Sequence, residues 1–339
     1  MSCRSILVRQ YSNVIEPCDR RRELQGRHEV KRLLVTGRHG FVGQTLERML
    51  DEDAGLRNWT IVETPEMLDL RDARATATMV SEAAPDAVLH LAAQSFVPES
   101  LRDPISTLQV NLFGTLNLLE GLKQSAFRGR MLYVGTGDVY GLVPEDRLPV
   151  TETFLPAPRN PYAVSKLAAE ALCYQWTVTE AMDIVLARPF NHIGWGQSDR
   201  FVVSDFAHQI MMIKAKGDAP VVAVGDIDVT RDFTDVRDIV RAYLALLESG
   251  TSGEAYNVCS GRARSIRSLL SRLAELAGIE IAIEQDTARL RRSEQRSICG
   301  DPTKISRATG WAATTPLDES LTGMLQFWEG GEHEWPTRR

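Results

Sequence analysis

Residues 31–43, KRLLVTGRHGFVG, decide the fold of this chain. The apolar run Leu33–Val35 is typical of a short buried strand, and the glycines that follow end it before a helical pattern begins. Gly37, Gly40 and Gly43 recur every three residues, which differs from G-x-G-x-x-G but serves the same geometry. Backbone N–H groups in such a turn, at a helix N-terminus, can meet a pyrophosphate. The stretch therefore predicts a dinucleotide-binding turn.

The alternation of strand and helix continues beyond this turn. We expect further strands at 60–62, 87–91, 131–134 and 184–187, separated by helices that include 73–83 and 112–122. Strands without polar alternation, separated by helices, indicate a parallel sheet covered on both faces. We predict an α/β fold with a doubly wound, Rossmann-type parallel sheet and a smaller, interleaved C-terminal lobe that binds substrate.

The domain boundaries are placed where the alternation of strand and helix begins and where it becomes irregular. We predict a dinucleotide-binding domain at 31–187, with 236–258 returning to it, and a mainly substrate-binding lobe at 188–235 and 259–335. Residues 1–30 are rich in arginine and show no lasting periodicity. We expect them to be a disordered extension, or an over-long gene start with Val30 as the true first residue.

Composition excludes several classes of function. The net charge of −6 gives no sign of a nucleic-acid partner. The five cysteines show no C-x-x-C spacing and the six histidines are scattered, so we predict neither disulfides nor a metal site. No apolar run approaches the roughly 20 residues that a membrane helix needs. We expect a cytoplasmic protein that does not bind membranes.

A second stretch, NPYAVSK at 160–166, carries the chemistry. Asn160 suits a helix N-cap, and Tyr162 and Lys166 lie four residues apart and share a helix face. An ammonium beside a phenol stabilises the phenolate and eases proton exchange. Thr136 follows the strand expected at 131–134 and offers a hydroxyl to the reacting oxygen. Together these residues predict a proton-transfer site for carbonyl or alcohol chemistry.

The choice of cofactor depends on two charged residues. Glu63 ends the second expected strand, where it would hold ribose hydroxyls and repel a 2′-phosphate, which favours NAD. Arg38 follows the first glycine and would pair with that phosphate. The segment after Glu63 is short, which argues against its carboxylate reaching the ribose. We expect NADPH, with NAD as the alternative.

The motifs resemble a known family. The glycine turn, the LAA segment at 91–93, the Thr136 strand end and YAVSK are similar to those of the extended short-chain dehydrogenase/reductases that act on nucleotide sugars. The resemblance runs from about Lys31 to about Trp328. The segments RPFNHIG at 188–194, RDF at 231–233 and RRSE at 291–294 resemble the members that modify GDP-mannose.

The resemblance implies a role for each matching residue. Thr136, Tyr162 and Lys166 match the catalytic triad, and Asn111 matches an asparagine that supports the lysine through a water. The residues implied for the cofactor are Gly37, Arg38, His39, Gly40, Phe41, Val42, Gly43, Asp69, Leu70, Leu91, Ala92, Ala93, Tyr162 and Lys166. Those implied for the substrate are Ser95, Phe96, Thr136, Asp138, Asn191, Val202, Arg231, Arg291 and Glu294.

The implied activity is NAD(P)H-dependent reduction of the C4 ketone of GDP-4-dehydro-6-deoxy-D-mannose to GDP-D-rhamnose. The alternative is a GDP-mannose 4,6-dehydratase that uses Asp138 as its base. The related dehydratases carry glutamate where Asp138 stands, and the shorter side chain favours simple reduction. A C4 epimerase and a non-catalytic, cofactor-sensing protein on the same fold are further alternatives. The resemblance also implies a homodimer or dimer of dimers, assembled through helices at 107–122 and 162–176.

Overall fold

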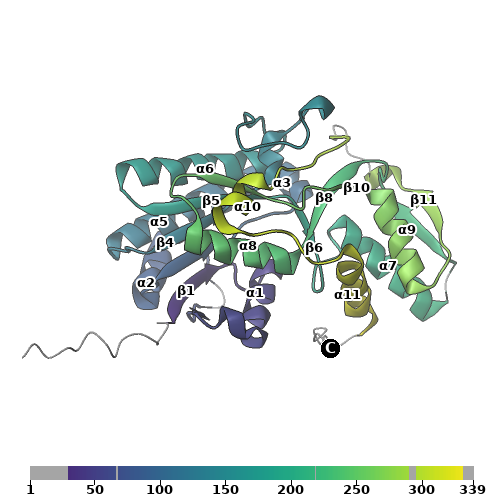
Figure 1. Cartoon of the computed structure of the whole chain (residues 1–339), viewed down its shortest axis with the longest axis horizontal. Helices are drawn as coiled ribbons and strands as arrows, with labels where there is room; N and C mark the ends of the chain where they lie inside the picture. The colour runs from purple at the N-terminus through teal and green to yellow at the C-terminus, as the bar shows by residue number, and fades with distance from the viewer. Residues whose placement is uncertain (1–29, 66–67, 218, 290–294, 331–339) are drawn as a thin grey trace, which may run out of the picture.

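The computed structural model describes residues 30–65, 68–217, 219–289 and 295–330. The expectations for residues 1–29, for Arg291 and for Glu294 lie outside these described residues. Figure 1 shows two parts side by side, a large sheet wrapped by helices and a smaller lobe that carries α7, α9 and α11.

A six-stranded parallel sheet forms the centre of the larger part, in the order β2-β1-β3-β4-β5-β9. Its strands are β1 (Lys31–Thr36), β2 (Trp59–Ile61), β3 (Ala87–His90), β4 (Arg130–Val134), β5 (Asp183–Pro189) and β9 (Ala255–Val258). The chain passes from β1 to β2 on one side and then crosses to β3 on the other. Ligands bind at such a reversal, beyond the carboxyl ends of the strands.

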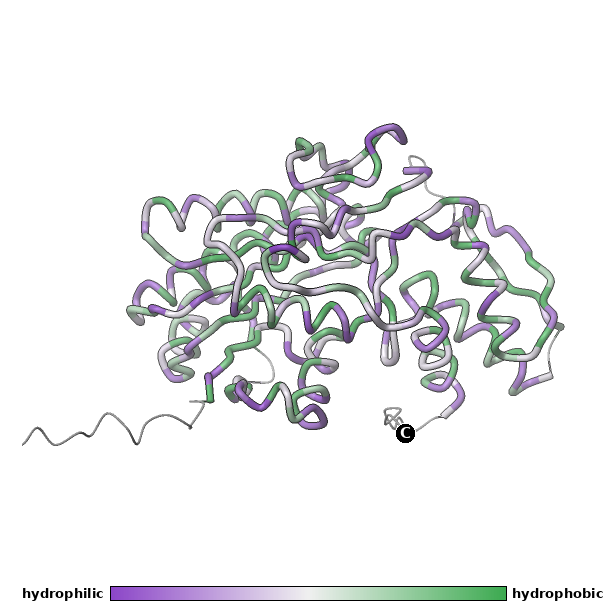
Figure 2. The backbone as a smooth tube through the Cα atoms, in the orientation of Figure 1, coloured by the Kyte–Doolittle hydropathy of each residue, from purple (hydrophilic) through white to green (hydrophobic). Residues whose placement is uncertain are grey.

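Side chains point alternately to the two faces of a strand, and the apolar strands of this sheet bury both faces. Leu33 and Val35 of β1 pack into one core, with α1 (Phe41–Glu52) and α8 (Val236–Ser249). Leu34, between them, packs into a second core. That core lies under α2 (Ala73–Ala83), α5 (Gly114–Gln124) and α6 (Pro161–Thr179). Figure 2 shows apolar residues following the central strands. The predicted α/β, doubly wound fold is confirmed.

The smaller lobe has its own apolar core and two small sheets. One sheet has the order β10-β8-β6 and the other pairs β11 with β7. Its elements are β6 (Asn191–Ile193), α7 (Val202–Lys216), β7 (Val221–Val224), β8 (Thr230–Asp235), β10 (Ala263–Ser265), α9 (Ile266–Ala277), β11 (Ala282–Gln285) and α11 (Leu317–Glu329). The 236–258 segment runs through α8 to β9, which pairs with β5 of the main sheet. The short helix α10 (Thr303–Thr309) also packs on α8 and β9.

Among the expected helices, the one at 112–122 differs most from its prediction. The chain forms α3 (Val97–Arg102) and α4 (Pro104–Leu108), then a π-helical turn at Gln109–Phe113 before α5. One-turn π bulges inside helices are frequent at functional sites. Here the turn contains Asn111. Short 3₁₀ turns complete the fold at Ala54–Leu56, Gly137–Tyr140, Glu145–Arg147 and Thr287–Arg289.

No helix in the described part of the chain is both long and apolar enough to span a membrane.

Candidate active site

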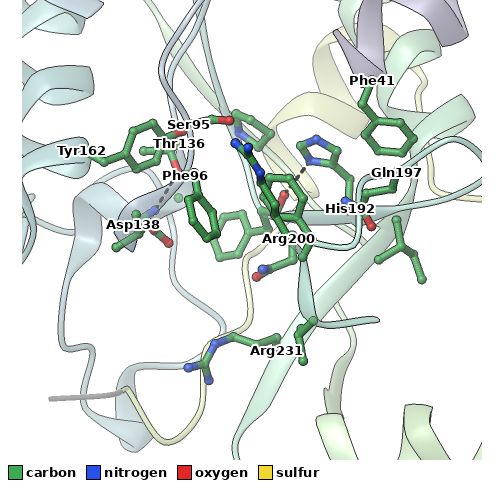
Figure 3. A pocket seen from close by; sticks show the side chains of 18 of the residues that line it. Phe41, Ser95, Phe96, Thr136, Asp138, Tyr162, His192, Gln197, Arg200 and Arg231 are labelled. Carbon is green, nitrogen blue, oxygen red and sulfur yellow. Dashed lines mark hydrogen bonds between the residues drawn. The ribbon is translucent and has the colours of Figure 1, made fainter. Parts of the chain in front are cut away.

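A cavity of about 970 Å³ opens beyond the carboxyl ends of β1, β3 and β4, against the smaller lobe. Its lining includes many of the predicted site residues, namely Gly37, His39, Gly40, Phe41, Val42, Gly43, Leu91, Ala92, Ala93, Ser95, Phe96, Thr136, Asp138, Tyr162, Lys166, Asn191, Val202 and Arg231. Figure 3 shows several of them around the opening. Arg38, Asp69, Leu70 and Asn111 do not line it. The Asp69 carboxylate instead pairs with Arg71, and Leu70 is buried.

The glycine turn is shaped for a close approach of backbone. Gly37 has a φ of +75°, and a Cβ there would lie 2.7 Å from the backbone nitrogen of Ala92. A Cβ at Gly43 would collide with the carbonyl oxygen of Arg38. Gly40 is the N-cap of α1 and provides no side chain to accept a hydrogen bond. The first N–H groups of the helix can therefore donate to a ligand. The turn therefore fits the pyrophosphate of a dinucleotide.

Arg38 lies behind this turn between two carboxylates. Its guanidinium contacts Glu47 Oε1 at 2.5 Å and Glu63 Oε2 at 3.0 Å. The hydrogen bond to Glu47 raises the pKa of Arg38 most, although burial opposes it. The Glu63 side chain is 88% exposed, whereas that of Arg38 is 16% exposed. The two residues that bear on the choice between NAD and NADP therefore contact each other.

The hydroxyl and the phenol meet at the end of β4. Asn160 caps α6 by accepting a hydrogen bond from the backbone N–H of Ala163 at 2.7 Å, which places Tyr162 in the first turn. The Thr136 hydroxyl lies near the Tyr162 phenol and acts on its pKa. Burial and the charge of Asp138 raise the pKa of Tyr162 above its usual range, and the Thr136 hydroxyl opposes them. The phenol is therefore protonated at neutral pH, and the effect of the Lys166 ammonium on its acidity stays a prediction.

Lys166 lies one helical turn further along α6 and is 3% exposed. Its Nζ is 4.7 Å from the centre of the Tyr133 ring. Burial lowers the pKa of Lys166 to about 8, while Cys173 and Glu170 on the same helix oppose the shift. Lys166 consequently titrates close to physiological pH.

Asn111 supports this helix from behind. Its Oδ1 accepts from the backbone N–H of Gln94 at 2.8 Å, and its Nδ2 donates to the Gln94 carbonyl and to Ser165 Oγ. Ser165 precedes Lys166, so the contact places Asn111 beside the helix that carries Tyr162 and Lys166. The water-mediated link from Asn111 to Lys166 stays a prediction.

A buried ion pair lies at the next turn of α6. Arg188 of β5 donates to both carboxylate oxygens of Glu170, at 3.0 and 2.6 Å. The side chains are 8% and 7% exposed. Arg188 also donates to the hydroxyl of Tyr140 at 3.0 Å. This network joins the helix that carries Tyr162 to the main sheet.

The smaller lobe supplies the facing wall. Phe96 contacts Phe201 edge to face, with ring centres 6.3 Å apart, and His192 stacks on Phe41 at 6.0 Å. Arg231 of β8 donates to the Thr230 carbonyl at 2.7 Å. Figure 3 shows Arg231 beyond the central aromatic side chains. No group of three or more His, Cys, Asp or Glu side chains suited to a metal ion occurs among the described residues.

Sequence reasoning missed Arg200, which lines the cavity from the loop before α7. It follows the 188–194 segment closely, but no spacing rule singles it out. Only the folding of that loop back over Phe96 brings it to the site.

Comparisons with known proteins find similarity to enzymes that act on nucleotide sugars. Residues 34–324 match the family described as GDP-mannose 4,6 dehydratase. The chain is 49% identical over 304 residues to GDP-6-deoxy-D-mannose reductase of Pseudomonas aeruginosa, covering 90% of this chain and 99% of the relative. A solved structure of RMD from Pseudomonas aeruginosa complexed with NADPH superposes with a TM-score of 0.84 at 49% identity, covering 88% of this chain and 99% of the other. UDP-glucose 4-epimerase of Thermus thermophilus, in complex with NAD, gives 0.77 at 29% identity, covering 89% and 100%.

Proposed function

Because this chain belongs to the extended short-chain dehydrogenase/reductase family of nucleotide-sugar enzymes, we propose that it reduces the C4 ketone of GDP-4-dehydro-6-deoxy-D-mannose to GDP-D-rhamnose with NADPH. The observation that carries the proposal is the meeting of Thr136, Tyr162 and Lys166 in one cavity with the glycine turn. The identity of 49% to a reductase of a GDP-linked deoxymannose supports the substrate class.

In this proposal the protein's own groups prepare the ketone. Tyr162, protonated at neutral pH, donates its proton to the ketone oxygen, and the Thr136 hydroxyl orients that oxygen. Lys166 in its ammonium form holds the nicotinamide ribose and favours the phenolate that Tyr162 becomes. NADPH supplies the hydride when it is bound. Holding the ketone and phenol together contributes much of the rate through proximity.

The turn at Gly37–Gly43 would hold the cofactor diphosphate, as its open helix N-terminus allows. Arg38 would pair with the 2′-phosphate of NADPH in exchange for its contact with the exposed Glu63. Asn191 and Arg231 would bind the diphosphate of the sugar nucleotide. The NADPH complex of the Pseudomonas aeruginosa relative supports this choice of cofactor.

Asp138 decides between reduction and dehydration. Its backbone N–H donates to Thr136 Oγ1 at 3.2 Å, the residue lines the cavity, and burial and its charge together raise the pKa of Tyr162. Removal of the proton at C5 with loss of the C6 hydroxyl needs a carboxylate that reaches the sugar. The side chain of Asp138 is one methylene shorter than the glutamate of related dehydratases, which favours simple reduction.

The test supplies purified protein with each of two substrates. With GDP-4-dehydro-6-deoxy-D-mannose and NADPH, we expect loss of NADPH absorbance in proportion to formation of GDP-D-rhamnose. With GDP-mannose and no reduced cofactor, we expect no 4-keto product. A 4-keto product from GDP-mannose would establish the dehydratase alternative. The dTDP-linked 4-keto sugar serves as the control for the nucleotide.

We also propose a homodimer, or a dimer of dimers, in the cytoplasm. Helices α3 and α4 pack against α6, and these three helices together with the π-helical turn at Gln109–Phe113 carry exposed apolar side chains. These are Leu101, Ile105, Phe113, Val164, Tyr174 and Val178, with exposures of 65%, 69%, 53%, 44%, 54% and 66%. An apolar face of this kind suits a two-fold interface. Light scattering should give a dimer mass that Ile105→Asp lowers to that of the monomer.

A further inference from the structure

The loop between β6 and α7 brings a positive charge into the cavity. Arg200 is an exposed residue of this loop and lines the cavity. Figure 3 draws its side chain in the middle of the pocket, between the side labelled Tyr162 and Thr136 and the side labelled Phe41 and His192. An arginine is charged at every physiological pH. A permanent cation therefore lies in this cavity.

The backbone that carries Arg200 is well anchored. The Gln197 side chain donates to the His192 carbonyl at 2.8 Å, and the Gln197 carbonyl accepts from Ser204 Oγ. The backbone N–H of Phe201 donates to the Ser198 carbonyl at 3.2 Å, which closes a turn around Arg200. The position of the loop is therefore set, and the long arginine side chain is the part with freedom to move.

The guanidinium rests on an aromatic ring. It lies 5.9 Å from the centre of the Phe96 ring, near the outer limit of about 6 Å for a cation–π contact. Within the described part of the chain, the Arg200 guanidinium has no carboxylate partner. Phe96 itself is held, because its backbone N–H donates to Gln94 Oε1 at 2.6 Å. A weak contact of this kind is easily exchanged for a stronger one with an anion.

We propose that Arg200 is a specificity-determining residue that binds the diphosphate of the sugar-nucleotide substrate. This inference rests on the proposed function. A nucleotide-sugar diphosphate carries two negative charges, and Arg231 supplies one positive charge on the same lobe. The planar guanidinium of Arg200 matches two phosphate oxygens in a bidentate contact. It also makes the site favour nucleoside diphosphates over monophosphates.

The position of Arg200 favours the substrate over the cofactor. The cofactor diphosphate has its own site at the N-terminus of α1, on the main-sheet side. Arg200 belongs to the opposite wall and lies two residues before Val202, which is predicted to bind substrate. Arg289, another arginine of the cavity, is already paired with Asp205 at 2.5 Å.

The experiment measures dissociation constants of the NADPH-saturated protein by calorimetry, with GDP and GMP as probes. For Arg200→Ala we expect GDP to bind roughly 10- to 100-fold more weakly, as for loss of a hydrogen bond to a charged group. GMP should change much less, and the affinity for NADPH should stay the same. Arg200→Lys should fall between, because it keeps the charge but loses the bidentate geometry. Arg128→Ala is the control, since Arg128 is exposed just before the amino end of β4, whereas the cavity lies beyond the carboxyl end of that strand.

Three results would overturn the role of Arg200: unchanged affinity for GDP, equal weakening of GDP and GMP, or weaker NADPH binding. Failure of the proposed function looks different, because the wild-type protein would then bind UDP or dTDP in preference to GDP. In that case the diphosphate and monophosphate of the preferred nucleoside replace GDP and GMP as probes. Arg200→Ala should then weaken binding of that diphosphate much more than binding of the monophosphate.

Discussion

The Asn111 side-chain amide donates to Ser165 Oγ at 2.8 Å and thereby joins a π-helical turn to the helix of Tyr162 and Lys166. The same amide binds the backbone of Gln94 on both sides. Gln94 in turn holds the backbone of Phe96. One buried asparagine thus sets the spacing between the helix of Tyr162 and Lys166 and the wall on which we expect substrate to lie.

Replacement of the phenol should remove the proton donor and leave the cofactor site intact. We expect Tyr162→Phe to lower kcat roughly 10²- to 10⁴-fold, the range for loss of a general acid. The affinity for NADPH, followed by fluorescence quenching, should change little. Tyr174→Phe is the matched control, because Tyr174 lies on the same helix but is 54% exposed. Near-normal turnover by Tyr162→Phe would remove Tyr162 from the mechanism.

The rate should depend on pH through Lys166. Burial lowers the pKa of Lys166 to about 8, so the ammonium predominates below that pH and is lost as pH rises through it. We expect kcat/KM for NADPH, which reports the free enzyme, to be level below pH 8 and to fall above it. Tyr162 does not titrate in this window because its pKa is raised. A profile that stays level to about pH 9.5, with circular dichroism unchanged, would show that the ammonium is not required.

Arg38 and Glu63 should affect the two cofactors in opposite directions. Arg38→Ala should weaken NADPH binding roughly 10- to 100-fold through loss of a charge-assisted contact with the 2′-phosphate. NADH, which lacks that phosphate, should bind nearly as before. Glu63→Gln should strengthen NADPH binding, because it frees Arg38 from a carboxylate at 3.0 Å and removes a negative charge. Equal effects of Arg38→Ala on NADPH and NADH would place the 2′-phosphate elsewhere.

The ion pair behind the site should matter for stability. Glu170→Gln leaves Arg188 charged and buried without its carboxylate, and we expect the free energy of unfolding in urea to fall by about 3–5 kcal/mol. Asp183→Asn is the comparison, since the pair of Arg130 and Asp183 is partly exposed, at 23% and 38%. That change should cost about 0–1 kcal/mol. Equal losses for the two variants would argue against a special role for burial.

Much of the fold could be predicted because its signals are local. The apolar strand at Leu33–Val35, the glycine turn and the Asn160 cap each act within a few residues, and the structure places β1, α1 and α6 where the sequence predicts them. The meeting of Thr136, Tyr162 and Lys166 in one cavity could be predicted as well, since Tyr162 and Lys166 share a helix face. These features need no knowledge of distant contacts.

Other features depend on contacts between distant segments. The π-helical turn at Asn111 forms beside Gln94 and Ser165, neither of which its local sequence specifies. The raised pKa of Tyr162 comes from burial and from Asp138, which belongs to another segment. Arg200 reaches the cavity only because its loop folds over Phe96. Tertiary packing determines each of these, so sequence patterns alone could not.

The most direct test of the central claim follows a deuterium label carried at C4 of the NADPH nicotinamide during a single turnover with GDP-4-dehydro-6-deoxy-D-mannose. Hydride delivery to the ketone, with the proton from Tyr162, predicts deuterium at C4 of the product sugar in the wild-type protein and almost none in Tyr162→Phe. A dehydratase delivers its hydride to C6, which is already a methyl group in this substrate, and would therefore leave the deuterium on NADPH. Absence of deuterium from the sugar, with NADPH unconsumed, would contradict the account.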